Sequence, residues 1–496
     1  MTLAAACGWS LVRSLVIALA AWPVCRAETN WLRNLPERKR RLVWWVLVIP
    51  FLCPELWAGY AWSGFAVRLA GTGLWNYLPA SLFPTPQSIV RRDGAVDEVL
   101  LDLLLFLRAI PVGTLALYFA PPPLLSREAR YCRDLAITRN VGQAFQPDFR
   151  LESLTSLPAL GLVFLAAFQE FELASLIGRP AWTVWLFDAQ VGGLALSESL
   201  RKTVLPVICQ LAVVVPLAVL ILTRRGQPGA KRHDAHRLSW SARCASYCAA
   251  ISGVFLLLVV PACLVGQATF SGLLRVVQSH TQTRMLFHEI FTGLGYALTA
   301  ALVSTFVVAS LLEAARRSRW VAVAICLVAV PGLVGSLVLG LVLIQLLQQP
   351  LLRFAYKSPL SLGTGLVLFL VPRALLLRFL LWSSARPAGE HLARLLGESR
   401  SSTIRGTAGE LLWQMRWRGE FWGVALLAYW GFFDLTTASL LAPVTIVSAP
   451  VMLYNQMHFG KNATLSALVL LTVLVPLAVF AVATVARRLV FRWFWR

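Results

Sequence analysis

Charged side chains inside apolar segments are the first candidates for function in this chain, because charge in hydrocarbon is costly and usually marks a pathway. The candidates are Glu55, Arg108, Glu170, Glu172, Arg373, Arg378 and Asp434. Glu172 and Asp434 stand out because they match in two related segments, Phe171-Glu172-Leu173 and Phe433-Asp434-Leu435. One interpretation places both carboxylates on a polar translocation path. The other is that each one caps or hydrogen-bonds the backbone of a broken helix.

The sequence contains no recognisable catalytic or metal-binding set. Its six histidines never pair with carboxylates at a metal spacing, and His233-Asp234-Ala235-His236 is better explained as a solvated turn. It has no Walker lysine loop, no GxSxG elbow and no HExxH helix. The nine cysteines are scattered and form no CxxC pair, which favours small buried hydrophobes. We therefore expect no catalytic residue, metal, cofactor or ATP hydrolysis in this chain itself.

The composition predicts an all-α polytopic membrane protein. The 496 residues are 58% hydrophobic and only 14% charged, with a mean hydropathy of +0.69. Apolar runs recur at lengths that cross a bilayer as helices, and the alternation of an outer-membrane barrel is absent. About eleven spans are expected. They are 10–27, 42–68, 97–119, 157–178, 203–223, 246–266, 290–312, 320–347, 359–382, 421–443 and 464–486.

The charge distribution predicts the orientation. The net charge of +22 comes from arginines that collect in alternate loops, as the positive-inside rule requires, and not from a nucleic-acid-binding module. We expect a multi-pass protein of the plasma (inner) membrane with its N-terminus outside and its C-terminus in the cytoplasm. Residues 10–27 could also be a cleaved signal peptide, but cleavage would leave the basic cluster Arg38–Arg41 outside.

The repeat extends beyond the acidic segments. Arg38-Lys39-Arg40-Arg41 is followed by Trp44 and Pro50, and Arg316-Arg317-Ser318-Arg319 is followed by Trp320 and Pro331. This pattern predicts two parallel halves of about five and about six spans, with span 246–266 as an additional leading helix. The domains are then a first half at 1–225, a cytoplasmic linker at 226–245 and a second half at 246–496.

Two large cytoplasmic loops, 122–156 and 383–420, each contain a short amphipathic segment. The first runs through Glu128 and Ala129, and the second is Glu390-His391-Leu392-Ala393-Arg394-Leu395-Leu396-Gly397. A helix of this kind can dock into the groove of a partner protein or rest on lipid headgroups.

These paired features resemble the fused type I permease subunits of binding-protein-dependent ABC importers, most closely the ferric-iron and thiamine branch. The family's cytoplasmic element reads EAA, three residues, then Gly. Ala393 to Gly397 has that spacing, although Glu390 lies one residue early with His391 in its place. In the first loop Glu128-Ala129 matches, but Asp134 replaces the glycine. The resemblance implies that Glu128, Ala129, Glu390, Ala393 and Gly397 couple the chain to its ATPase subunits.

The resemblance also implies the activity and the partners. The expected chain is a non-enzymatic transport subunit that forms the path for a small solute, ferric iron or similar. Two separate ABC ATPase subunits would hydrolyse ATP, and an extracytoplasmic solute-binding protein would deliver the solute. Two alternatives stay open. One is an ion-coupled secondary transporter, consistent with Glu172 and Asp434. The other is a membrane-embedded glycosyl or lipid transferase, for which Asp188, Glu198, Arg275 and His280 are widely dispersed.

The predicted orientation can be tested by labelling. A membrane-impermeant thiol reagent applied to intact cells should modify a cysteine placed at Ser197 and spare one placed at Ser401. The reason is that loop 179–202 carries few positive charges and loop 383–420 is rich in arginine. The reverse pattern would refute the whole orientation.

Overall fold

The chain folds entirely into helices wherever its structure is described. The computed structural model describes residues 2–65, 67, 88–119, 148–223, 240–315, 318–356, 358–384, 387–398, 402–443, 445–457, 460 and 462–494. All regular elements within these ranges are helical. The all-α prediction is therefore confirmed for this part of the chain.

The helices follow one another with short connections in the described ranges. Those of the first half of the sequence are α1 (Leu3–Asn34), α2 (Glu37–Leu52), α3 (Glu55–Trp62), α5 (Ser88–Phe119), α7 (Asp148–Phe168), α8 (Glu172–Ile177), α9 (Trp182–Val191) and α10 (Leu196–Thr223). Next come α11 (Trp240–Val254), the π-helical turn η3 (Phe255–Val259), α12 (Val260–Gln278), α13 (His280–Ala315), α14 (Arg319–Leu333), α15 (Ser336–Leu347), α16 (Arg353–Tyr356) and α17 (Pro359–Ser384). The last are α18 (Pro387–Gly397), α19 (Ser402–Leu412), the π-helical turn η4 (Trp413–Trp417), α20 (Arg418–Phe433), α21 (Leu435–Leu441), α22 (Ala449–Met457) and α23 (Ala463–Phe494).

Several of these helices have the length and composition of membrane spans. Among the described residues seven single helices meet that requirement, and the number rises to ten if each of three bent helix pairs counts as one span. The expected span 157–178 is not a single helix. Its apolar part, Ser156–Phe168, is shorter than a bilayer requires, and the rest belongs to α8 after a break.

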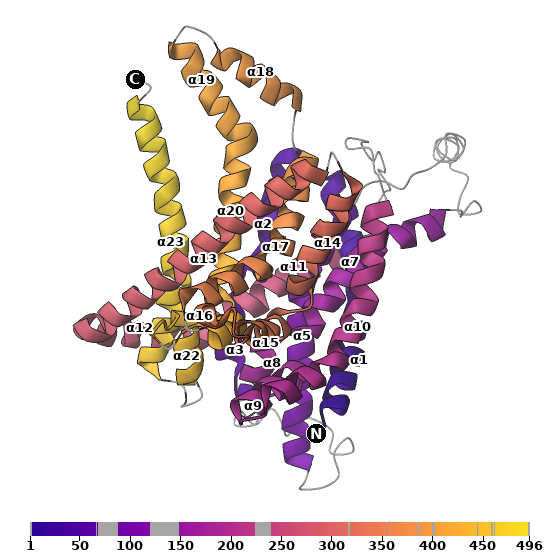
Figure 1. The fold of residues 1–496 in the computed structure, drawn as a ribbon, viewed down its shortest axis with the longest axis vertical. Coiled ribbons are helices and arrows are strands. Elements are labelled where there is room, and N and C mark those ends of the chain that lie inside the picture. The colour runs from indigo at the N-terminus through magenta and orange to yellow at the C-terminus, as the bar shows by residue number, and fades with distance from the viewer. Residues whose placement is uncertain are drawn as a thin grey trace.

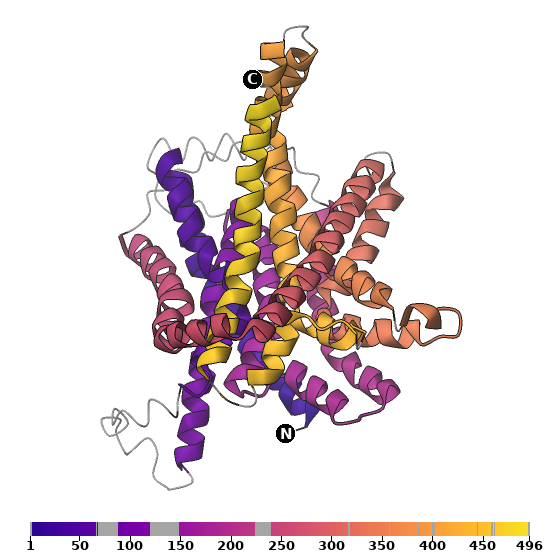
Figure 2. The same ribbon diagram turned by 90° about the vertical axis from the view of Figure 1, so that its left-hand side faces the viewer.

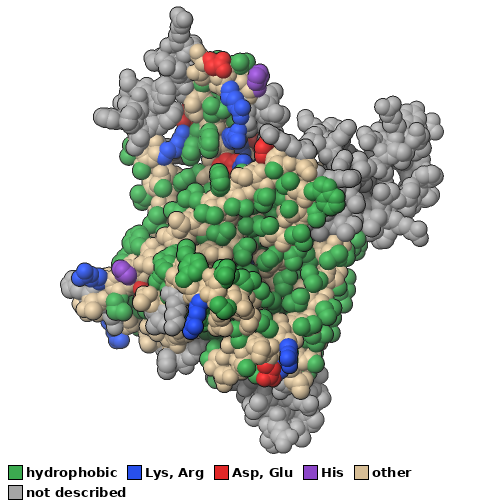
Figure 3. Space-filling view, viewed as in Figure 1, with side chains coloured by type: hydrophobic (Ala, Val, Ile, Leu, Met, Phe, Trp, Pro, Cys, Tyr) green, Lys and Arg blue, Asp and Glu red, His purple; other side chains and the backbone are tan. Residues whose placement is uncertain are grey.

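The outer surface agrees with a lipid environment. Large apolar side chains face outward on the long helices, among them Phe306 at 74% exposure and Val482 at 66%. Figure 3 shows hydrophobic side chains across the middle of the molecule, with most charged groups toward its ends. Such a surface would be costly in water but matches hydrocarbon. The described part of the chain is therefore all-helical and has the apolar surface of a membrane protein.

Three of the breaks have a visible backbone cause. Pro54 separates α2 from α3, which meet at 68°, because proline has no N–H and disfavours helix in the residue before it. Gly335 separates α14 from α15 with a φ of +102°, a value that few other residues tolerate. Asp434 separates α20 from α21, which meet at 59°, and has an extended ψ of 90°.

The same helix contacts occur in both halves of the sequence. Helix α1 packs against α5 and α7, and α13 packs against α17 and α20. The short helix α3 packs against α8, and α15 packs against α21. At the last two contacts a glycine gives a leucine room to approach. A Cβ on Gly59 would lie 2.6 Å from Leu176, and one on Gly340 would lie 2.7 Å from Leu440.

Two helices from the segment 383–420, which the sequence predicts to be cytoplasmic, extend one end of the molecule. Helices α18 and α19 project beyond the bundle beside the C-terminal end of α23 (Figures 1 and 2). The N-terminus lies toward the opposite end. Within the second half of the sequence, α12 packs closely along α23.

The contact between α12 and α23 depends on Gly272. A Cβ at this position would lie 1.8 Å from the carbonyl oxygen of Ala463, so Gly272→Ala must push the two helices apart. We expect the free energy of unfolding to fall by about 1–3 kcal/mol. Thermal unfolding of the purified protein in detergent would measure the change.

Gly266 on the same helix is the matched control. An added Cβ there meets nothing within 4 Å, so Gly266→Ala should be neutral or stabilise by up to about 1 kcal/mol through helix propensity. Equal stability of the two variants would contradict the packing of α12 on α23.

Candidate functional site

Four carboxylates gather where the broken helices meet. Glu55 begins α3, Glu172 begins α8, Glu170 lies in the turn before α8, and Asp434 lies immediately before α21. The last three are 6–8% exposed. The charge of Glu172 interacts with those of Glu55, Glu170 and Asp434, so the four groups form one cluster. We call them the axial carboxylate cluster.

Two of these carboxylates bind backbone N–H groups at helix beginnings. Oε1 of Glu170 accepts a hydrogen bond from the N–H of Leu173 at 2.8 Å. Oε1 of Glu172 accepts one from the N–H of Leu435 at 3.2 Å. The first bond caps α8 locally, whereas the second caps α21 from the other half of the sequence. Glu172 therefore accepts a backbone hydrogen bond at a helix break, and this bond links segments 263 positions apart.

Two arginines provide positive charge beside the cluster. Arg108 of α5 donates to Glu55 at 2.6 Å and to the carbonyl oxygen of Cys53 at 3.0 Å. Arg373 of α17 donates to the carbonyl oxygen of Phe369, and its guanidinium lies 3.6 Å from the centre of the Phe369 ring. The charge of Arg373 interacts with those of Asp434 and Glu55. Each arginine thus compensates a carboxylate close to it.

Further bonds around the cluster join the two halves of the sequence. Gln169 donates through Nε2 to the carbonyl oxygen of Leu333 at the break between α14 and α15. The hydroxyls of Ser175 and Tyr454 lie 2.6 Å apart, and those of Tyr60 and Ser466 lie 2.9 Å apart. Each of these contacts involves a residue in, or next to, one of the short helices α3, α8, α15 and α22.

A second polar assembly lies in the first half alone. Arg13 bonds to Glu98, which also accepts from Trp9 at 2.7 Å and from Arg179 at 2.8 Å. Asp102 lies 3.2 Å from Arg13. The sequence analysis did not predict this network. Arg13 could have indicated it, because a charged residue within an apolar run needs a partner of opposite charge.

The coupling residues expected from the resemblance lie elsewhere. Glu390, Ala393 and Gly397 belong to α18 at the projecting end of the molecule, whereas Glu128 and Ala129 lie outside the described residues. Ala393 is fully buried where α18 packs on α19. Leu392 and Leu395 of the same helix are more than half exposed. Helix α18 is thus an amphipathic helix with one apolar pair left uncovered.

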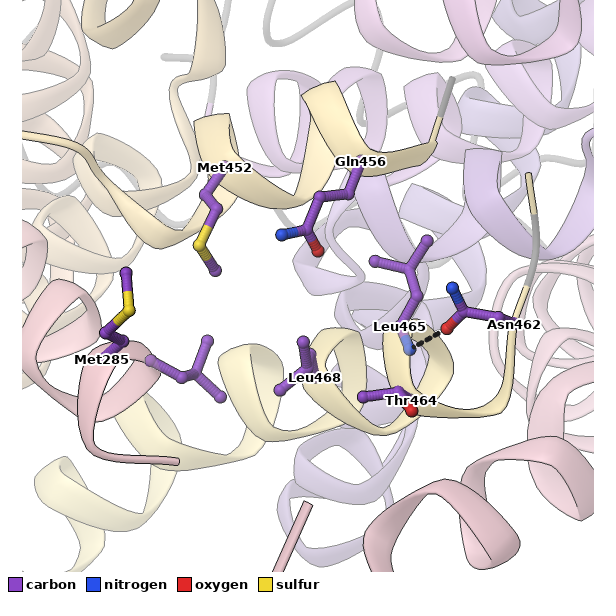
Figure 4. A pocket seen from close by; sticks show the side chains of 8 residues that line it. Met285, Met452, Gln456, Asn462, Thr464, Leu465 and Leu468 are labelled. Atoms are coloured by element: carbon purple, nitrogen blue, oxygen red, sulfur yellow. Dashed lines mark hydrogen bonds between the residues drawn. The ribbon is translucent and has the colours of Figure 1, made fainter. Parts of the chain in front are cut away.

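A cavity of about 320 Å³ opens between α13, α22 and α23. Met285, Met452, Gln456 and Asn462 are among its lining residues, and none of the lining side chains is charged. Figure 4 shows the Asn462 side chain accepting from the N–H of Leu465, a bond of 2.6 Å. The cavity therefore offers amide and thioether groups but no general acid or base.

Comparison with known proteins does not assign the chain to a family. The chain matches no family model, no curated protein and no solved structure. Within the described residues no three His, Cys, Asp or Glu side chains are arranged to hold a metal ion. The functional argument therefore rests on the geometry of the axial carboxylate cluster and of α18.

The ion pair of Arg108 with Glu55 should stabilise the cluster. Arg108→Leu leaves a poorly solvated carboxylate without its partner, so we expect unfolding to become easier by about 1–3 kcal/mol. The double variant Glu55→Leu/Arg108→Leu should recover part of that loss, because no unpaired charge remains. Unfolding in mixed detergent micelles would provide the free energies.

The matched control is the pair of Arg41 with Glu37. Its nitrogen–oxygen distance is also 2.6 Å, but both side chains are mostly exposed. Arg41→Leu should therefore cost less than about 1 kcal/mol. A larger effect at Arg41 than at Arg108 would show that burial does not govern these pairs.

Proposed function

We propose that the chain is the membrane-spanning permease subunit of an ATP-driven ABC importer. In this proposal about eleven spans form two parallel halves, 1–225 and 246–496, joined by the linker 226–245. The observation that carries it is the meeting of two repeat-equivalent acidic helix breaks, Glu172 and Asp434, at one central site. A transport path between two repeats is the usual place for such groups.

The duplicated packing supports two related halves. The contacts of α1 with α5 and α7 correspond to those of α13 with α17 and α20. The glycine-to-leucine contacts at α3–α8 and α15–α21 correspond as well. Among the described residues of the first half, α11 and α12 have no such counterpart, which is consistent with an additional leading helix.

The shape of α18 supports a docking role for a partner on the cytoplasmic side. Ala393 faces α19, while Leu392 and Leu395 remain uncovered at the projecting end of the molecule (Figure 1). An amphipathic helix laid into a groove contributes apolar anchors spaced as these are. In this proposal the groove belongs to an ATPase subunit.

The projecting helices are tied to the membrane core. Arg487 near the end of α23 lies 3.3 Å from Glu410 of α19, and its guanidinium is 3.5 Å from the centre of the Trp413 ring. Arg378 of α17 bonds to Glu420 of α20. Helix α20 then leads to Asp434. Motion of docked ATPase subunits could thus pass through α20 and α23 to the central site, and the two halves would rock about it.

The proposed cargo is a small solute, ferric iron or similar, which an extracytoplasmic binding protein delivers. The excess of carboxylates over guanidinium groups in the cluster supports passage of a positively charged species. The same feature favours the runner-up function, an ion-coupled secondary transporter. The proposed location is the plasma (inner) membrane, with the projecting helices and the C-terminus in the cytoplasm.

Capture of a partner tests the proposal. The tagged chain purified from its native membrane should bring down an ABC ATPase subunit, and Leu392→Asp/Leu395→Asp should reduce that capture at least about tenfold by removing buried apolar anchors. Gly397→Trp should leave capture intact while lowering transport per ATP hydrolysed. Mass spectrometry and a transport assay in vesicles would measure both.

Leu351 is the control position, because it is 86% exposed and lies outside α18. Leu351→Asp should not alter ATPase capture. If the unmodified chain captures no ATPase subunit and transport proceeds without ATP, the importer proposal is wrong and the ion-coupled alternative takes its place.

A further inference from the structure

The axial carboxylate cluster holds more negative charge than its surroundings compensate. It contains Glu55, Glu170, Glu172 and Asp434, and the arginines that interact most directly with it are Arg108 and Arg373. Arg13 also interacts with Glu170, but its guanidinium is already bonded to Glu98 and lies close to Asp102. Arg108 also interacts with Glu170 and Glu172, but the hydrogen bonds that these two carboxylates accept come from backbone N–H groups.

Burial makes that excess costly. Glu170, Glu172 and Asp434 are each at least nine-tenths buried. Oδ2 of Asp434 accepts no well-formed hydrogen bond from any described residue, although the hydroxyls of Ser336 and Thr437 lie near this carboxylate. An unpaired carboxylate removed from water costs several kcal/mol. A carboxyl group in this position normally becomes neutral by taking up a proton. Tyr454 of α22 brings a hydroxyl group near Glu172, and Tyr429 of α20 brings one near Arg108, but neither side chain adds positive charge.

The position of the cluster links this charge to the contact between the halves. Glu172 comes from the first half and binds the N–H of Leu435 in the second. Ser175 and Tyr454 make a second bond across the same contact, 2.6 Å long. If the halves part, these bonds break and water reaches the carboxylates. Closure reverses both events.

We propose that the axial carboxylate cluster is a proton-binding site, and that proton uptake there holds the two halves of the chain together. The inference rests on the proposed function only in assuming that the halves separate during transport. On opening, the O–H bond of a cluster carboxyl breaks, the carboxylate keeps the electron pair, and the proton passes to water. On closing, the carboxylate takes a proton back. Each cycle therefore exchanges protons with the solution that the site faces.

The pH dependence of stability tests the proposal on the full-length protein alone. A folded state that binds protons that the unfolded chain releases loses stability as pH rises. The thermal unfolding midpoint should therefore decrease as the pH is raised from about 6 to about 9, which is above the ordinary carboxyl pKa values. Glu172→Gln and Asp434→Asn should each flatten this dependence, because they stay neutral at every pH. Glu37→Gln, at an exposed carboxylate, should leave the slope unchanged.

Infrared spectroscopy detects protonated carboxyl groups directly. Its signal would not change with pH if the cluster carboxylates only stabilised the fold. The carbonyl band of a protonated carboxyl group should be present at neutral pH, should weaken as pH rises and should be reduced in Glu172→Gln. That variant keeps an oxygen that can accept from Leu435, so it is expected to fold. The proposal would be overturned if the wild-type protein lacked this band and its unfolding midpoint depended on pH no more steeply than that of Glu172→Gln.

A bound metal cation would neutralise the same carboxylates, and the following experiment distinguishes a proton from a metal cation. Unfolding is repeated after chelator treatment and with added sodium, magnesium or calcium. Stability restored at high pH by a cation, with no protonated carboxyl band, would assign the site to that cation and overturn the proton proposal. None of these measurements involves an ATPase. Failure here leaves the importer function standing, and failure of ATPase capture leaves the proton site standing.

Discussion

The main physical constraint on this fold is that backbone groups freed at a helix break must find a partner within the protein. The hydrogen bond from the N–H of Leu435 to Glu172 meets this requirement. In hydrocarbon no water can satisfy a backbone group, so a helix may break only where protein covers the break. Here a carboxylate from one half of the sequence covers the start of a helix from the other. Glu170 caps α8 from within its own half, whereas the N–H of Leu435 at the start of α21 is satisfied only because the two breaks meet.

The other features of the core follow from that meeting. Buried carboxylates need compensating charge, and Arg108 and Arg373 approach from α5 and α17 to provide part of it. The short helices must lie close together, and Gly59 and Gly340 remove the side chains that would prevent it. Bonds such as Ser175–Tyr454 then fix how the two groups of helices face each other. A site that is polar, enclosed and shared by two bodies is suited to respond when those bodies move.

The proposed permease would connect this centre to its projecting end. Arg487 ties α23 to Glu410 and Trp413, and α20 continues from the projecting region to Asp434. Because α18 packs on α19, and α19, η4 and α20 follow one another as helix from Ser402 to Phe433, a push on α18 would have a route to the cluster. The proton proposal adds a chemical consequence to that motion, because separating the halves would hydrate the carboxylates. The mechanical and the chemical event would then share the residues Glu172 and Asp434.

By itself the sequence determined that the chain is helical and apolar, and it singled out Glu172 and Asp434, because hydropathy, charge and repetition are local properties. It also predicted the amphipathic segment that became α18. It did not reveal that Glu172 caps α21, that Arg108 pairs with Glu55 or that Arg13 pairs with Glu98, since each contact joins distant segments. It also expected a continuous span at 157–178, whereas the structure breaks there. A helix can break within an apolar segment when the protein provides hydrogen-bond partners for the exposed backbone N–H and C=O groups. A partner that is distant in sequence is brought into place only by the tertiary structure.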